Sequence, residues 1–330
     1  MLKLAMIIIG SLVGAGFASG QEIMIFFNRY GTMGIWGILL TGGLLSFFSW
    51  VTLKVSQNLK LRNYRELIEL SLNPRFQFLG DIIFTTVLFG GLGVMLSASG
   101  AIFEEYFNLP GIAGVALLLI LVLVAAQFRL HGLYYINTIL TPLLILFLII
   151  ISSREIIAFT YLKSSETWLE NWLSSAIIYT SYNILLLGSV LVPLGRELKS
   201  KELTGGVMLG AVIFLILAAL IYFALAANYP EVLKYQVPLL YVAAKKHVLS
   251  FWLFGISIWL AVATTAVSDG VALTLRLAKK RNLLLIFYCL SFLLALIPFQ
   301  YLVKYLYPFF GYAGFLFLYC LLKLVIGTKW

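Results

Sequence analysis

The first hydrophobic segment contains a run of glycines that few membrane-spanning helices would carry. It reads GSLVGAGFASGQE from Gly10 to Glu22, with Gly14, Gly16 and Gly20 inside the run. Each glycine in a helix interior costs about 1 kcal/mol relative to alanine. Backbone at membrane depth stays non-helical only where it is buried in protein or lines a cavity. The segment therefore predicts a helix that is broken at an ion or substrate site. The alternative is an unbroken helix whose small residues, four apart, allow close packing against a neighbour.

The composition shows in which class of protein this segment lies. Hydrophobic residues make up 62% and charged residues 11% of the 330 residues, and the mean hydropathy is +1.03. These values are typical of an all-α integral membrane protein. A span across the hydrocarbon core needs about 20 apolar residues. Ten transmembrane helices are expected, near residues 3–28, 34–56, 77–103, 111–128, 132–152, 171–194, 203–227, 249–275, 283–299 and 305–326.

The distribution of charge predicts the orientation of these spans. The net charge is +10, but the basic residues fall in short loops, so no nucleic-acid partner is expected. Sixteen Lys and Arg residues lie on the side of the two termini and seven on the other side. The positive-inside rule then predicts that both termini are cytoplasmic. The two cysteines and two histidines are too scattered for a disulfide framework or a metal site.

The order of the spans predicts an internal repeat. Residues 1–152 would form a first repeat of five helices and residues 153–330 a second, and an odd number gives the two repeats opposite orientations. The second repeat begins with the span near 171–194, which contains the polar run from Tyr179 to Asn183. An interrupted segment at the corresponding place in each repeat indicates a transporter site between them. We therefore expect a 5+5 inverted repeat in which helices 1 and 6 are discontinuous.

The glycine-rich stretch carries a family resemblance. GSLVGAGFASGQE resembles the opening motif of the YkvI-type bacterial membrane proteins, a group placed with the amino acid–polyamine–organocation transporters. The run from Gly10 to Gly16 is also similar to the first helix of sodium-coupled transporters with the LeuT fold. The resemblance covers the whole chain in span count, but its motif covers only about a dozen residues. It implies a multi-pass protein of the bacterial inner (plasma) membrane and a glycine motif that holds a substrate carboxylate. With the polar and aromatic residues that could complete a pocket, the candidate substrate-binding residues are Gly14, Ala15, Gly16, Phe17, Tyr179, Ser181, Tyr182 and Trp259.

A second match to the LeuT-type pattern lies in the eighth span. Ala261, Thr264 and Thr265 share one helical face because they are three and four residues apart. The resemblance implies that this face and the broken first helix hold a sodium ion. The implied ligands are the carbonyls of Gly10, Val13 and Ala261 and the hydroxyls of Thr264 and Thr265. The alternative is that the threonines only bond back to their own helix.

Two departures from the family pattern bear on coupling. Phe17 stands where neurotransmitter-type relatives have an asparagine for a second sodium ion, so that second site is not expected. The fifth span also lacks the lysine that proton-coupled relatives carry in place of sodium, which favours sodium over a proton.

Ionisable residues inside the membrane are functional candidates because they are costly there. On a continuous helix, Glu22 would lie about 9 Å beyond Gly16, where it could meet Lys304 in an outer gate. The alternative is that Glu22 faces water and Lys304 snorkels to the interface. Asp81 and Asp269 are expected toward the cytoplasm, either paired with a basic residue or simply at helix ends. No acidic side chain is expected at the pocket centre, which argues against polyamines.

These features together predict a secondary active transporter. The favoured function is sodium-coupled symport of a neutral amino acid or a similar small zwitterion or carboxylate, by alternating access. Sodium as coupling ion is the only cofactor expected, and the partners are the lipid bilayer and the small-molecule substrate. The alternatives are a proton-coupled or uncoupled carrier, a channel, or a ligand-sensing receptor with a transporter fold. An enzyme is not expected, because no paired carboxylates and no hydroxyl beside a base are evident.

Overall fold

The first hydrophobic segment is built from three short helices. The computed structural model describes residues 1–128, 133–153, 171–198, 200–245, 248–277 and 281–327. In it the segment forms α1 (Leu2–Leu12), α2 (Ala15–Ala18) and α3 (Gln21–Phe26). Gly14 is extended, with φ −82° and ψ −174°. Gly20 has φ +82°, a left-handed conformation that glycine adopts without the steric cost of a side chain. The chain thus changes direction at two of the glycines that the sequence singles out.

The remaining described elements are also helical, and the described residues contain no strand. The long helices are α4 (Met33–Leu59), α6 (Gln77–Glu105), α7 (Gly111–Phe128), α8 (Leu133–Ser153), α9 (Trp172–Gly195), α10 (Ser200–Ala227), α12 (Val248–Arg276), α13 (Arg281–Leu294) and α14 (Phe299–Gly327). Between them lie η1 (Asn28–Tyr30), α5 (Tyr64–Ser71), η2 (Pro74–Phe76), η4 (Glu231–Lys234) and α11 (Pro238–Ala244). The boundary between the last two long helices lies earlier than the sequence suggests, since α13 ends at Leu294 and α14 begins at Phe299. The Pro298 carbonyl accepts the N–H groups of Tyr301 and Leu302 at the start of α14.

Helix α9 corrects one expectation. The sequence predicts an interruption near Ser181, but α9 is one continuous α-helix of 24 residues. Two side chains of the polar run bond back to the helix rather than opening it. Thr180 Oγ1 donates to the Ala176 carbonyl at 2.8 Å, and Asn183 Nδ2 donates to the Tyr179 carbonyl at 2.9 Å. Such bonds satisfy polar groups locally, and no glycine or proline stands where the break was expected.

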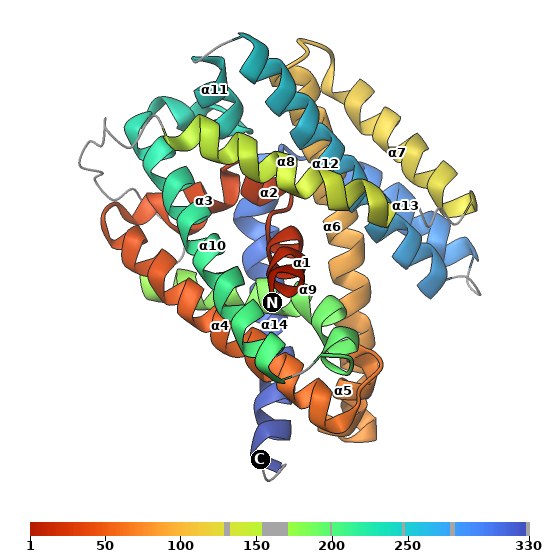
Figure 1. Cartoon of the computed structure of the whole chain (residues 1–330). Coiled ribbons are helices and arrows are strands. Elements are labelled where there is room, and N and C mark those ends of the chain that lie inside the picture. The colour runs from red at the N-terminus through yellow and green to blue at the C-terminus, as the bar shows by residue number, and fades with distance from the viewer. Residues whose placement is uncertain (129–132, 154–170, 199, 246–247, 278–280, 328–330) are drawn as a thin grey trace.

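The helices pack in two groups around the first segment. In the first group α1 packs on α10, α10 on α4, and α4 on α9. In the second group α6 packs on α7, α12 and α13. Figure 1 shows α1 near the centre, with α4 and α10 to its left and α6, α7 and α13 to its right. Helices α8 and α14 contact members of both groups. The broken segment therefore lies where the two groups meet.

Helix α11 covers the end of the first segment that is remote from the N-terminus. The Leu239 N–H donates to the Ser19 carbonyl at 2.9 Å, which ties the start of α11 to the turn between α2 and α3. The side chain of Leu239 also lies against Gly20. Residues 15–28 are buried throughout. The first segment is therefore enclosed on this side.

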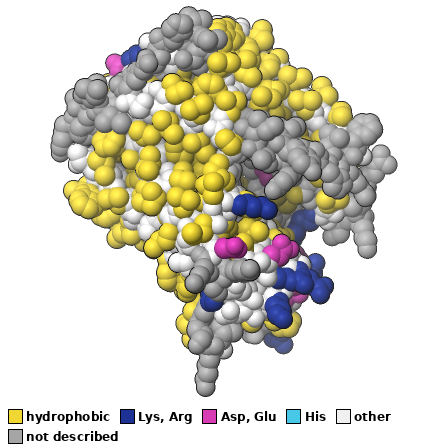
Figure 2. All heavy atoms as spheres, viewed as in Figure 1, with side chains coloured by type: hydrophobic (Ala, Val, Ile, Leu, Met, Phe, Trp, Pro, Cys, Tyr) yellow, Lys and Arg dark blue, Asp and Glu magenta, His cyan; other side chains and the backbone are white. Residues whose placement is uncertain are grey.

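The exterior of the molecule is suited to lipid. Six described helices are long and apolar enough to cross a bilayer, and four further apolar helices are shorter. Large hydrophobic side chains such as Trp36, Ile216 and Leu293 are exposed. Figure 2 shows a face covered mainly by hydrophobic side chains, with charged side chains gathered toward its lower part. The protein is a multi-pass membrane protein.

Candidate substrate and ion site

A cavity of about 340 Å³ lies at the break between α1 and α2. Its walls come from the α1–α2 segment and from α6, α8, α9, α12 and α14. Both helix groups therefore contribute to it. Ligand pockets commonly measure about 300–1,000 Å³, so this one admits a single small molecule and not a large one.

The broken backbone supplies polar groups to the cavity. The last backbone bond of α1 runs from the Val13 N–H to the Ile9 carbonyl, and the next runs from the Ala18 N–H to the Gly14 carbonyl. Within the described residues, no backbone hydrogen bond uses the carbonyls of residues 10–13 or the N–H groups of residues 14–17. Unpaired backbone groups in an apolar setting are costly unless a ligand or water satisfies them. The break thus offers acceptors on one side and donors on the other.

Among the described residues, the exposed part of the cavity wall lies on one side. Ser189 and Val190, in the C-terminal half of α9, line it and are exposed, while Gly10 and Ser11 are half-buried. Toward α3 and α11 the first segment is fully buried. The opening therefore lies on the side from which α1 enters the molecule.

The structure gathers most of the sequence candidates around this cavity. The candidates that line it are Gly10, Val13, Gly14, Ala15, Gly16, Glu22, Tyr182, Ala261, Thr264 and Thr265. The proposed substrate residues of the first segment and the proposed sodium ligands thus share one space, although they lie some 250 positions apart in the chain.

Four of the proposed substrate residues lie elsewhere. Phe17 is fully buried, with its ring 5.8 Å from that of Phe214 on α10. Tyr179 is fully buried and packs on Phe26. Ser181 is buried toward α14, where its Oγ has no hydrogen-bond partner. Trp259 Nε1 donates to Ser99 Oγ at 2.9 Å. These side chains are directed away because each sits on the face of its helix that packs against a neighbouring helix.

The threonine pair has a defined geometry. Thr264 Oγ1 and Thr265 Oγ1 both donate to the Ala261 carbonyl, at 3.0 and 2.9 Å. The hydroxyls bond back to their own helix, as the structural alternative predicts, and both residues line the cavity. With the unpaired carbonyls of Gly10 and Val13, they form a set of neutral oxygen donors. This donor chemistry suits a hard monovalent cation and fits the implied sodium site.

Two carboxyl groups on the wall correct the expectation of a pocket without acids. Glu22 lines the cavity and is only 3% exposed. A side chain on Gly16 would overlap its Oε1 atom, so the carboxyl lies directly against the broken backbone. Asp269 lines the cavity from α12 and faces Gly91 of α6. The distance of about 9 Å expected between Gly16 and Glu22 assumes a continuous helix, whereas the turn at Gly20 folds α3 back.

In the part of the chain that the structure describes, the expected outer gate between Glu22 and Lys304 is not formed, whereas Asp81 is paired with a basic residue as one alternative predicts. Glu22 Oε2 accepts a hydrogen bond from Tyr179 at 2.9 Å, and no ion pair of the described residues joins it to Lys304. Lys304 Nζ lies over the Tyr305 ring, 5.0 Å from its centroid. Asp81 pairs with Arg276 at 2.5 Å. This pair joins α6 to α12 within one helix group, so it braces that group rather than gating between the two.

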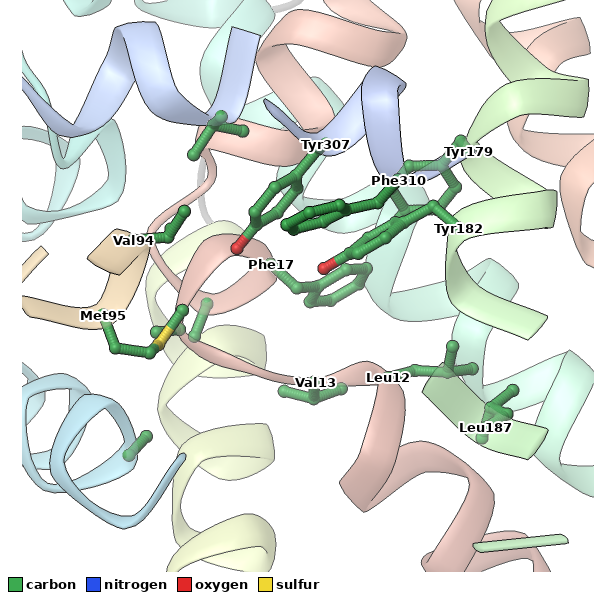
Figure 3. Close-up of a cluster of buried hydrophobic side chains, with 14 of the residues drawn as sticks. Leu12, Val13, Phe17, Val94, Met95, Tyr179, Tyr182, Leu187, Tyr307 and Phe310 are labelled. Carbon is green, nitrogen blue, oxygen red and sulfur yellow. The ribbon is translucent and has the colours of Figure 1, made fainter. Parts of the chain in front are cut away.

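The sequence reading missed part of the wall. Tyr307 and Phe310 of α14 line the cavity, and the Tyr182 and Tyr307 rings stack 4.6 Å apart. Figure 3 shows these three rings together beside the extended stretch that carries Val13. Pro308 inside α14 was a usable signal, since proline within a span often marks a functional irregularity. The sequence identifies Asp269 as an acidic residue inside the membrane, but it does not show that the side chain is directed toward the cavity.

The comparisons with known proteins agree with this arrangement. No family model matches the chain. It is 28% identical over 333 residues to the uncharacterized membrane protein YkvI of Bacillus subtilis (strain 168), covering 97% of this chain and 94% of that protein. It is 28% identical over 343 residues to the uncharacterized protein YyaD of the same strain, covering 100% and 98%.

Solved structures are similar over the whole chain. One is MhsT in complex with L-phenylalanine, with a TM-score of 0.65 and 16% identity, covering 100% of this chain and 90% of that one. The chain has the LeuT-type transporter fold. Another is Mhp1, a nucleobase-cation-symport-1 family transporter with bromovinylhydantoin bound, with a TM-score of 0.55, 11% identity, and 99% and 71% coverage. At these identities the likeness concerns the fold.

Proposed function

We propose that the protein is a secondary active transporter that couples a small organic solute to sodium by alternating access. The observation that supports this most is the single cavity shared by the broken first segment and the Ala261, Thr264 and Thr265 face. A solute and an ion bound there would both contact α1–α2 on one side and α12 on the other. Each ligand would then favour the same relative position of the two helix groups, which is the physical basis of coupling.

The architecture that we propose is the 5+5 inverted repeat, residues 1–152 over 153–330. Six long and four shorter apolar helices correspond to the ten predicted spans. In this scheme α1, α4, α9 and α10 rock against α6, α7, α12 and α13, and the cavity between them opens to alternate sides. With cytoplasmic termini in a bacterial plasma membrane, the structure is inward-facing, because the cavity opens beside α1 and α9.

Cysteine labelling tests the proposed topology. A cysteine at Arg62 should react only from the cytoplasm, and one at Lys163, which lies outside the described residues, only from the exterior. Labelling of both positions from one side would contradict the inverted repeat.

Sodium would be held by the carbonyls of Gly10, Val13 and Ala261 and the hydroxyls of Thr264 and Thr265. Bound there, it would join the broken first segment to α12 and favour a cavity ready for the solute. The solute would lie along the break, where the carbonyls of residues 10–13 can receive a donor such as an ammonium group. The substrate class predicted from the sequence is a neutral amino acid or similar small zwitterion.

Uptake into proteoliposomes tests the function. The purified protein should accumulate at least one labelled solute from a panel of amino acids and small amines when an inward sodium gradient is imposed. Replacing sodium by potassium should abolish the accumulation. Accumulation driven by a pH gradient without sodium would instead identify a proton-coupled carrier. Ionic current without saturation would identify a channel, and binding without accumulation a receptor.

A further inference from the structure

We propose that Glu22 makes the cavity selective for small organic amines that carry no carboxylate of their own. This inference rests on the transporter function proposed above and names the class of its substrate. In this view the protein supplies from α3 the negative group that an amino acid would bring with it.

The placement of Glu22 is the first support. The side chain is 3% exposed, yet it lines the cavity. Its Oε2 accepts a hydrogen bond from Tyr179, whereas Oε1 has no hydrogen-bond or ion-pair partner among the described residues. Oε1 lies against Gly16, at the start of α2. One carboxylate oxygen is thus held by Tyr179 and the other remains available to a ligand.

The charge of the wall is the second support. Asp269 adds another carboxyl, and the described residues that line the cavity include no lysine, arginine or histidine. Within the described part of the chain, neither Glu22 nor Asp269 forms an ion pair. A buried carboxylate without a cation is costly in a membrane, and a positively charged ligand removes that cost.

The aromatic wall is the third support. Tyr182, Tyr307 and Phe310 line the cavity together, with the Tyr182 and Tyr307 rings stacked at 4.6 Å. In Figure 3 the Tyr182 and Tyr307 rings lie beside Phe310 and near the extended stretch of the first segment. Aromatic faces attract organic cations, and attract them more when water is excluded. An alkyl or aryl amine would place its ammonium group by Glu22 and its apolar part on these rings.

The same geometry disfavours two other ligand classes. A substrate carboxylate directed at the N–H groups of residues 14–17 would approach the Glu22 carboxyl, and like charges so close repel each other. A divalent metal ion needs several acidic, His or Cys ligands, and the described residues contain no group of three that could hold one. Both observations favour an organic monocation as the solute.

Matched pairs of probes test the proposal on the unmodified protein. Phenethylamine and L-phenylalanine differ by one carboxylate, as do isoamylamine and L-leucine. Binding is measured on the full-length protein in detergent by thermal shift and by competition, in sodium and in potassium. We expect each amine to bind at least about tenfold more tightly than its amino acid. Tighter binding of the amino acids overturns the proposal and leaves the proposed transport function standing.

Variants locate the effect. Glu22→Gln keeps the shape of the side chain and should weaken amine binding at least about tenfold, whereas Glu104→Gln, at an exposed glutamate outside the cavity, should not change it. Glu22→Asp retains the charge and serves if Glu22→Gln fails to fold, because it should keep the preference for amines. If Glu22→Gln binds amines normally but its uptake loses dependence on pH, Glu22 is a proton site and the proposal is wrong.

The two proposals fail in different ways. Suppose that amines bind the unmodified protein and lose affinity in Glu22→Gln, but never accumulate in proteoliposomes. This result would contradict the proposed transport function and support the proposed selectivity for amines. Solutes that accumulate with sodium but show no preference for amines would do the reverse.

Discussion

In the proposed inverted repeat the first hydrophobic segment and α9 occupy corresponding places, yet only the first is broken. The first segment divides into α1, α2 and α3, whereas α9 runs unbroken over 24 residues. Both segments contain polar residues, so polarity does not distinguish them. What differs is backbone freedom: the first has glycine at the extended position 14 and at the left-handed position 20. A hydroxyl or amide can bond back to its own helix, but a glycine offers nothing that holds the helix closed.

Proline gives the strongest test of this difference. Ser181→Pro should destabilise the protein by about 3 kcal/mol or more, because it removes a backbone N–H donor and its hydrogen bond inside α9 and clashes with the preceding turn. Gly14→Pro should cost about 1 kcal/mol or less, since the Gly14 N–H has no backbone acceptor and its φ of −82° is close to that of proline. Thermal unfolding and size-exclusion profiles of the two variants measure the contrast. Equal losses would mean that the first segment is not open at Gly14.

Filling the break should remove ligand binding without unfolding the protein. A side chain on Gly14 meets no atom within 4 Å, so Gly14→Leu would extend into the cavity. We expect a loss of affinity of at least about 100-fold, or about 2.7 kcal/mol, at nearly unchanged thermal stability. Gly43→Leu is the matched control, because that exposed glycine on α4 also has open space around it. Retained binding in Gly14→Leu would place the ligand elsewhere.

The dependence of solute binding on sodium tests the proposed link between the broken segment and α12. Sodium and solute should each tighten the binding of the other by the same factor, and a coupling of about 1–3 kcal/mol corresponds to roughly 5- to 150-fold. Thr265→Val and Thr264→Val should each reduce this factor, and the double variant should abolish it. Titrations of solute in sodium and in potassium measure it directly. If the unmodified protein binds the solute equally well in sodium and in potassium, the two threonines serve helix packing and do not hold a coupling ion.

The smallest effect concerns the bonds that keep α9 closed. Thr180 is buried, does not line the cavity, and donates to the Ala176 carbonyl. Thr180→Val should cost about 0.5–1.5 kcal/mol, the usual contribution of one such hydrogen bond, and leave ligand affinity unchanged. Urea or thermal unfolding together with one binding isotherm is sufficient. A change in ligand affinity would show that the hydrogen bonds inside α9 influence the cavity.

The limits of prediction follow from the same residues. Hydropathy located the apolar helices because lipid imposes length and apolarity on a spanning helix, and the glycine spacing located the break. The direction of side chains was a different matter. Phe17 lies within the motif but packs on Phe214, away from the cavity, since one residue along a helix turns the side chain by about 100°. Glu22 was misplaced because its position depends on the φ of Gly20, which the sequence permits but does not specify.

The hydrogen bond between the Leu239 N–H and the Ser19 carbonyl fixes α11 to the first segment on the side opposite the cavity opening. In the proposed alternating access, the first segment has to move relative to α11 before the cavity opens on that side, so this contact would loosen in every cycle. An antibody fragment that recognises residues 228–244 and holds them against the first segment would stop turnover without entering the cavity. Such a reagent would act as a non-competitive inhibitor, and its block would persist at any concentration of solute.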